Sequence, residues 1–217
     1  FSGATGSGKT TTLNILSSYI SADERIITIE DTAELKLNQE HVVTLEAKPG
    51  NIEGRGEITI RDLFRNSLRM RPERIILGEI RSSEALDMLQ AMCSGHDGSL
   101  AVLHASSSQD VISRIETMIL ISGVNIPMWA IKKQIASSLN LIVQQEQLVD
   151  GSRKITHITE VWGLLNEELL LQDLFSYEIE GVQEGKVKGA WKNHGVVPLF
   201  FNRFKKKGVE LNEEIFK

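Results

Sequence analysis

The chain has 217 residues, of which 41% are hydrophobic and 24% are charged, as in an ordinary globular protein. Its net charge of −5 argues against a nucleic-acid interaction that is held mainly by electrostatics. The single cysteine, Cys93, excludes an internal disulfide and a cysteine-rich zinc cluster, and we expect it to be buried. No apolar run approaches the roughly 18 residues that a membrane span needs.

A phosphate-binding loop pattern, GxxxxGK followed by Ser or Thr, occupies the start of the chain. Glycines let backbone N–H groups point inward at an anion, and the helix expected at 9–20 adds its positive N-terminal end. Lys9 supplies positive charge to the β- and γ-phosphates, and the Thr10 hydroxyl is a ligand for Mg²⁺. The alternative is a plain turn rich in glycine, serine and threonine. The predicted ATP-binding residues are Gly3, Ala4, Thr5, Gly6, Ser7, Gly8, Lys9, Thr10 and Thr11.

Such a loop follows a buried β-strand, but only Phe1 and Ser2 precede it. We therefore expect the chain to be cut through the end of its first strand.

A β-branched run at 26–29 predicts a buried strand, and acids follow it directly. Glu30, Asp31 and Glu34 are candidates to orient an attacking water or to hold Mg²⁺ through water. A solvated acidic turn is the alternative. A second short strand is expected at 42–45, before a long loop that contains several glycines.

Five arginines lie between positions 61 and 74, on and just after a helix expected at 59–70. Arg61, Arg65 and Arg69 recur every four residues and therefore share one face. A guanidinium reaches two phosphate oxygens at once, so these residues are candidate phosphate sensors. A solvated helix face is the alternative.

The apolar strand expected at 75–79 ends in Glu79 beside the phosphate loop, where a carboxylate meets Mg²⁺ or water. Arg81 follows two residues later and is a further candidate phosphate sensor. A helix is expected at 83–94 and another strand at 100–103, flanked by His96 and His104. Either imidazole could bond the γ-phosphate and report its loss.

The rest of the chain alternates helical and strand patterns. We expect helices from the serines at 106–108 to Gly123 and from Pro127 to about 139. A strand at 141–143 and a hairpin or meander around Asn166 should extend the sheet. After residue 176 glycines break the pattern, and residues 199–207 suggest a short amphipathic helix.

The ordered motifs resemble the Walker A, Asp-box, Walker B and His-box series of the type II/IV secretion ATPases. Further strings are similar to the tight-adherence (Flp pilus) branch, the CpaF-type ATPases. The motifs are residues 3–10, 29–35, 75–81 and 95–104, and the strings are residues 85–92 and 158–160.

This resemblance implies an α/β fold: a RecA-like P-loop NTPase domain with a mostly parallel central sheet and a β-hairpin or meander extension. It also implies an N-terminal domain that is missing here. We expect the ATPase domain at 1–176 and a small C-terminal appendage at 177–217.

The implied function is an ATP-hydrolysing, Mg²⁺-dependent motor of a pilus or secretion system that powers the assembly or retraction of pilin-like subunits. The implied assembly is a homo-hexamer at the cytoplasmic face of the inner membrane, working through a platform protein on pilin or pseudopilin. By the same resemblance Glu34 ranks first as water-orienting base, Glu79 assists Mg²⁺ and water, and His96 or His104 senses the γ-phosphate.

Two other functions stay open. A RecA-like nucleic-acid translocase is favoured by the arginine segment, but the acidic total and the 6% aromatic content argue against it, so no nucleic acid is expected as a partner. A small phosphotransferase would be a monomer.

Overall fold

The computed structural model describes the backbone of residues 1–217 and every side chain except that of Lys205. The helices are α1 (Lys9–Ser17), α2 (Ile60–Ser67), α3 (Glu84–Cys93), α4 (Ser108–Ile121), α5 (Met128–Ser138) and α6 (Phe201–Lys206), with 3-10 turns at Leu68–Met70 and Glu213–Phe216. The strands are β1 (Ile26–Glu30), β2 (Val42–Glu46), β3 (Arg74–Leu77), β4 (Leu100–Ala101), β5 (Leu141–Gln147), β6 (Arg153–Leu165), β7 (Glu168–Gln183) and β8 (Lys186–Asn193).

Two four-stranded sheets meet at the start of the chain. The first is parallel in the order β2-β1-β3-β4, and the second is antiparallel in the order β5-β6-β7-β8. Ser2 forms parallel bridges to both Leu103 and Gln144, so residues 1–2 occupy a strand position between the two sheets. The phosphate loop therefore does follow a strand position, as its mechanism requires. The expected mixed α/β fold with a mostly parallel sheet and an antiparallel extension is confirmed.

The parallel sheet is buried on both faces, which explains its continuous β-branched strands. Ile27, Ile29 and Ile75 point to the larger core, which α2, α3, α4 and α5 cover. Their neighbours Ile26 and Ile76 point the other way, against Leu13 of α1 and Leu35. This alternation follows the two-residue period of a strand.

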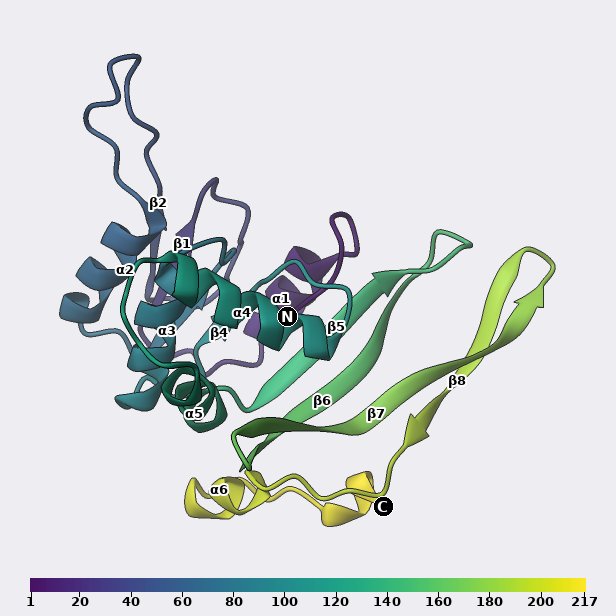
Figure 1. Ribbon diagram of the computed structural model, residues 1–217. Coiled ribbons are helices and arrows are strands. Elements are labelled where there is room, and N and C mark those ends of the chain that lie inside the picture. Colours follow the sequence, from purple (N-terminus) through teal and green to yellow (C-terminus); the bar gives the residue numbers. More distant parts are fainter.

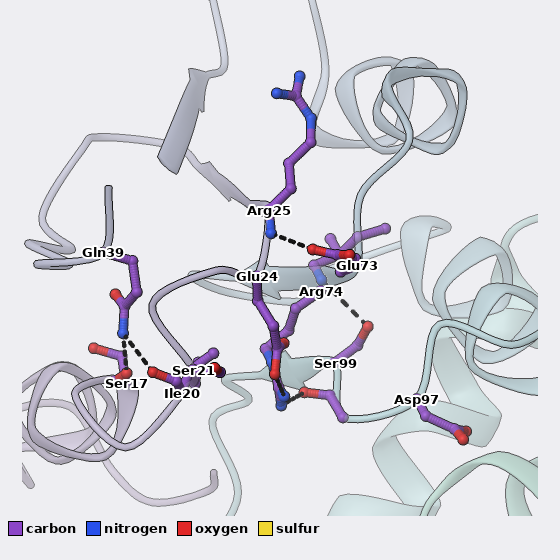
Figure 2. A network of polar contacts seen from close by, with 12 residues as sticks. Ser17, Ile20, Ser21, Glu24, Arg25, Gln39, Glu73, Arg74, Asp97 and Ser99 are labelled. Atoms are coloured by element: carbon purple, nitrogen blue, oxygen red, sulfur yellow. Dashed lines mark hydrogen bonds and ion pairs between the residues drawn. The ribbon is translucent and has the colours of Figure 1, made fainter. Parts of the chain in front are cut away.

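A polar network closes the amino ends of β1 and β3 (Figure 2). Arg74 donates from Nε and Nη2 to Glu24, at 2.8 and 2.9 Å, and from Nη1 to the Gly98 carbonyl at 2.6 Å. The backbone N–H of Arg25 donates to Glu73 at 2.5 Å. Arg74 is thus engaged in holding strand ends together, at the end of the sheet opposite to the carboxyl ends that carry the phosphate loop.

The antiparallel strands form an arm whose β5–β6 and β7–β8 tips project away from the helices, whereas its β6–β7 end lies beside α5 (Figure 1). The hairpin expected around Asn166 is confirmed, although its strands are longer than the apolar runs indicated. Glycines after residue 176 do not end the strands: Gly181 lies at a bulge, and Gly189 packs under the Tyr177 ring. Since β7 passes through position 176, the division of the chain there stays a prediction.

The last segment returns to the arm. Leu174, Phe201 and Phe216 form a small core with α6 packed against the sheet, as expected for an amphipathic helix. Cys93 is exposed at the end of α3, beyond the last buried residue of that helix, so its expected burial is wrong. Among the described residues, no helix is both long enough and apolar enough to cross a membrane.

Candidate functional site

A cavity of about 580 Å³ opens where the phosphate loop meets the carboxyl ends of β1 and β3. It collects residues from five separate parts of the chain, which include all the predicted acids and one of the two predicted histidines. Its lining is Thr5, Gly6, Gly8, Lys9, Thr10, Thr11, Leu13, Glu30, Asp31, Thr32, Glu34, Leu35, Gly78, Glu79, Arg81, Val102, His104 and Arg153.

The loop is shaped by backbone that side chains would prevent. A Cβ on Gly3 would lie 2.1 Å from the Gln145 carbonyl oxygen, because the loop crosses β5 closely. Gly8 has a φ of 95° and forms the N-cap of α1 without a side-chain cap, so the first N–H groups of α1 stay available to a ligand.

Lys9 is buried under the loop and donates from Nζ to the carbonyl oxygens of Gly3, at 2.9 Å, and Ala4, at 2.8 Å. Burial lowers the pKa of Lys9, and the charge of Glu79 opposes that shift. The lysine is thus held folded back on its own loop, within reach of the cavity. A phosphate would offer it a charged acceptor in place of two neutral carbonyls.

Glu30 serves the turn that follows β1. Its carboxylate accepts the backbone N–H of Glu34 at 2.9 Å and that of Leu35 at 3.0 Å. Burial raises the pKa of Glu30, and these two hydrogen bonds oppose the shift. The side chain is only 3% exposed, so Glu30 shapes the acidic turn more than it faces the cavity.

Glu34 lines the cavity from that turn with an exposed side chain. Because Glu30 accepts the backbone N–H of Glu34, the backbone from which this side chain projects is held by a buried carboxylate. A carboxylate that is accessible from the cavity can receive a proton from water there.

Glu79 is the centre of a chain of polar contacts. Its Oε2 lies 2.5 Å from Arg81 Nη2, and its Oε1 lies 3.2 Å from His104 Nε2. Arg81 also reaches Asp31, with 2.9 Å between Nη1 and Oδ2. Burial would raise the pKa of Glu79, but the hydrogen bond and charge of Arg81, with His104 and Lys9, outweigh it and lower that pKa.

His104 joins this chain to the phosphate loop, since its Nδ1 lies 3.4 Å from Lys9 Nζ. The imidazole thus stands between Lys9 and Glu79 and lines the cavity, and its role as a phosphate sensor stays a prediction. His96 does not line the cavity; its Nδ1 lies 3.3 Å from the Ala91 carbonyl oxygen, near the end of α3.

Arg61 and Arg65 of α2, and Arg69 of the 3-10 turn that follows it, lie elsewhere. Arg61 and Arg65 both pair with Asp87 of α3, at 2.6 and 3.0 Å, and so fix one helix to the other. Arg69 is exposed, and none of the three lines the cavity. A phosphate-sensing role for them stays a prediction, because their face points to another part of the surface.

The cavity residues fit a nucleoside triphosphate with Mg²⁺. Ser7 Oγ is buried and has no hydrogen-bond partner among the described residues, which suits a loop that is completed by an anion. Thr10 and Glu79 both line the cavity and offer oxygen ligands, the kind that Mg²⁺ takes together with phosphate oxygens and water.

Arg153 is a cavity residue that sequence reasoning missed. It begins β6, and its Nε donates to the Gly6 carbonyl at 2.7 Å, although 147 positions separate the two residues. A single arginine after a turn carries no local signal. Only the adjacency of β5 to the first two residues brings it to the loop.

The family model for "Type II/IV secretion system protein" matches residues 1–203. The type IV secretion system protein PtlH of Bordetella pertussis is 38% identical over 167 residues, which cover 74% of this chain and 48% of that protein. The solved VirB11 ATPase of the Brucella suis type IV secretion system, in complex with sulphate, superposes with a TM-score of 0.64 at 34% identity. That match covers 72% of this chain and 47% of the VirB11 chain. The chain therefore spans about half the length of the relatives it matches.

Proposed function

Because the chain belongs to the type II/IV secretion system protein family, we propose that it is the ATP-hydrolysing part of a secretion or pilus motor. The observation that carries this proposal is the single cavity in which the phosphate loop, the acids after β1 and β3, and His104 come together. The sulphate in the similar VirB11 ATPase supports an anion site in this fold.

In the proposed reaction, Lys9 and the N–H groups at the start of α1 hold the phosphates. Mg²⁺, when bound, neutralises charge that develops on the phosphate oxygens. Thr10 and Glu79 would hold that ion, partly through water. Glu34 orients the attacking water and receives its proton. His104 and Arg81, which both contact Glu79, respond to the γ-phosphate.

The finer assignments are also proposals. We propose the tight-adherence, CpaF-type branch on the strings at 85–92 and 158–160. We further propose a homo-hexamer at the cytoplasmic face of the inner membrane that works through a platform protein on pilin or pseudopilin. The ATPase unit would cover residues 1–176, with 177–217 as an appendage and a further domain before the loop.

The test is nucleotide binding and hydrolysis by the 217-residue chain. Wild-type protein should bind Mg·ADP, whereas Lys9→Ala should lose tight binding. The ATPase rate should rise more steeply than linearly with protein concentration, because each site of a ring borrows residues from a neighbour. Linear activity from a proven monomer would contradict the ring, and stimulation by nucleic acid would favour the translocase.

A further inference from the structure

We propose that Arg153 is a positioning residue for the phosphate loop, which it sets from the antiparallel arm into its anion-binding form. The inference rests on the proposed function, because it concerns the same nucleotide site. It adds a residue that lies outside every motif of the sequence.

The first argument is the orientation of the Gly6–Ser7 peptide group. Arg153 Nε holds the Gly6 carbonyl oxygen at 2.7 Å. In a trans peptide the C=O of one residue and the N–H of the next point in opposite directions. Fixing the Gly6 carbonyl toward Arg153 therefore turns the Ser7 N–H into the loop, where it lies 3.3 Å from the Ala4 carbonyl oxygen.

That carbonyl is also an acceptor for Lys9 Nζ, at 2.8 Å. The Ser7 N–H and the Lys9 ammonium therefore converge on one point inside the loop. Both donors now share one neutral carbonyl oxygen, and an anion at that point would be a stronger acceptor for them. Without Arg153, the Gly6–Ser7 peptide could rotate, since Gly6 has a φ of 77° and a Cβ placed there would meet no atom within 4 Å.

The second argument is that hydrogen bonds fix the turn that precedes Arg153. The turn before it is tied by Asp150, whose Oδ1 accepts the N–H of Ser152 at 3.0 Å and its hydroxyl at 2.6 Å. Asp150 Oδ2 also accepts the N–H of Val187, in β8, at 2.8 Å. These contacts fix the β5–β6 turn to the neighbouring hairpin, so Arg153 rises from a rigid base.

The third argument is close packing. A Cβ on Gly8 would lie 3.1 Å from Arg153 Cδ, so the stem of the arginine rests against the loop. Arg153, although exposed, is also one of the residues that line the cavity. Arg153 therefore combines a charge-assisted hydrogen bond with van der Waals support at the same loop.

The experiment measures the dissociation constant of Mg·ADP with a fluorescent ADP analogue. Arg153→Met keeps the length of the stem and removes the donor, and we expect affinity to fall about tenfold, equivalent to about 1.4 kcal/mol. Arg153→Lys, which can still donate to the Gly6 carbonyl, should restore affinity to within about threefold of wild type. Where hydrolysis is measured, KM for ATP should rise while kcat stays within about twofold.

The matched control is Lys154→Met. Lys154 is the next residue of β6 and points to the other face of the strand, with Nζ 5.5 Å from the centre of the Tyr177 ring. The Lys154→Met substitution removes one positive charge from the same strand and should leave the affinity for Mg·ADP unchanged.

The outcomes separate the two proposals. If wild-type protein fails to bind Mg·ADP, the proposed function fails. If wild type binds and Lys9→Ala does not, but Arg153→Met binds like wild type, the role of Arg153 is overturned. Should Arg153→Met fail to fold, Arg153→Gln replaces it, and wild-type affinity in a folded Arg153→Gln overturns the role equally.

Discussion

The carboxylate of Glu79 and the guanidinium of Arg81 meet at 2.5 Å in the loop that follows β3. The same guanidinium holds Asp31 of the acidic turn at 2.9 Å. One arginine therefore neutralises an acid from each of two strand ends. The hydrogen bond and charge of Glu79 raise the pKa of Arg81, so the arginine stays charged throughout the working pH range.

Replacing Arg81 with Gln should shift the pH dependence of hydrolysis. Burial favours the neutral form of Glu79, and Arg81 is the strongest of the contacts that reverse this effect. Without Arg81 the pKa of Glu79 rises, so Glu79 becomes protonated at a higher pH. The acid limb of kcat/KM against pH should move upward.

Arg65→Gln is the control for that experiment, because Arg65 pairs with Asp87 and does not line the cavity. Its acid limb should match that of wild type. An unchanged acid limb in Arg81→Gln would show that Glu79 does not need its charge in the rate-limiting step.

Glu34→Gln should bind nucleotide but hydrolyse it slowly. The amide cannot take a proton from water, and loss of a general base costs about 10²- to 10⁴-fold in rate. Affinity for Mg·ADP should stay within about twofold, because Glu34 holds no phosphate in the proposed reaction. Glu40→Gln, an exposed acid outside the cavity, is the matched control. Normal turnover in Glu34→Gln would move the role of base to Glu30, Asp31 or Glu79.

Gly78→Ala should destabilise the protein by displacing Glu30. The added Cβ would lie 2.7 Å from Glu30 Cγ, and Glu30 cannot move without releasing the N–H groups of Glu34 and Leu35. Overpacking of this kind costs about 1–3 kcal/mol in the free energy of unfolding. Urea denaturation measures it.

The double variant Gly78→Ala, Glu30→Ala provides the internal test. Truncating Glu30 makes room for the new methyl group. The double variant should therefore lose less unfolding free energy than the sum of the two single-variant losses, with a coupling of about 0.5 kcal/mol or more. Simple additivity would mean that the contact between the two positions is not the source of strain.

Much of the site could be predicted because its residues follow strands directly. Glu30 and Glu79 come at or just after apolar runs, and parallel strands bring their carboxyl ends to one edge of the sheet. The sequence pattern alone could not rank these acids. Glu30 turns out to be a buried acceptor of backbone N–H groups, whereas Glu34 faces the cavity.

Contacts between segments far apart in the chain could not be predicted from the sequence pattern. Arg61 and Arg65 share Asp87 of α3 as their partner, a contact between helices that the four-residue repeat does not specify, and Arg69 falls in the 3-10 turn after α2. Arg153 reaches the loop because β5 pairs with residues 1–2, and β6 pairs with β5. The length of β7 and β8 could not be predicted for another reason. In the sequence Gly181 indicates the end of a strand, whereas in the structure it lies at a β-bulge and the strand continues past it.

We expect Glu160 to make the stability of the chain depend on pH. This carboxylate is 2% exposed; Oε1 accepts the N–H of Leu199 at 2.8 Å, and Oε2 is buried without a hydrogen-bond partner among the described residues. Burial raises the pKa of Glu160, opposed by the backbone N–H groups of Leu199 and Phe200. Because the pKa of Glu160 is raised in the folded state, its contribution to the free energy of unfolding is fully present at pH values below the ordinary pKa of 4.5. That contribution is lost as the pH rises through the higher pKa of the folded state.

Glu160→Gln keeps the acceptor for Leu199 and removes the charge. It should therefore be more stable than wild type at pH 7, by on the order of 1 kcal/mol, with the difference shrinking toward pH 4.5 as wild type becomes protonated. Urea unfolding at both pH values measures this. Glu178→Gln, an exposed glutamate of β7 paired with Lys192, should show no such gain. A Glu160→Gln variant that is less stable than wild type at pH 7 would show that the ionised carboxylate, held by two N–H groups, is the form that anchors the C-terminal segment.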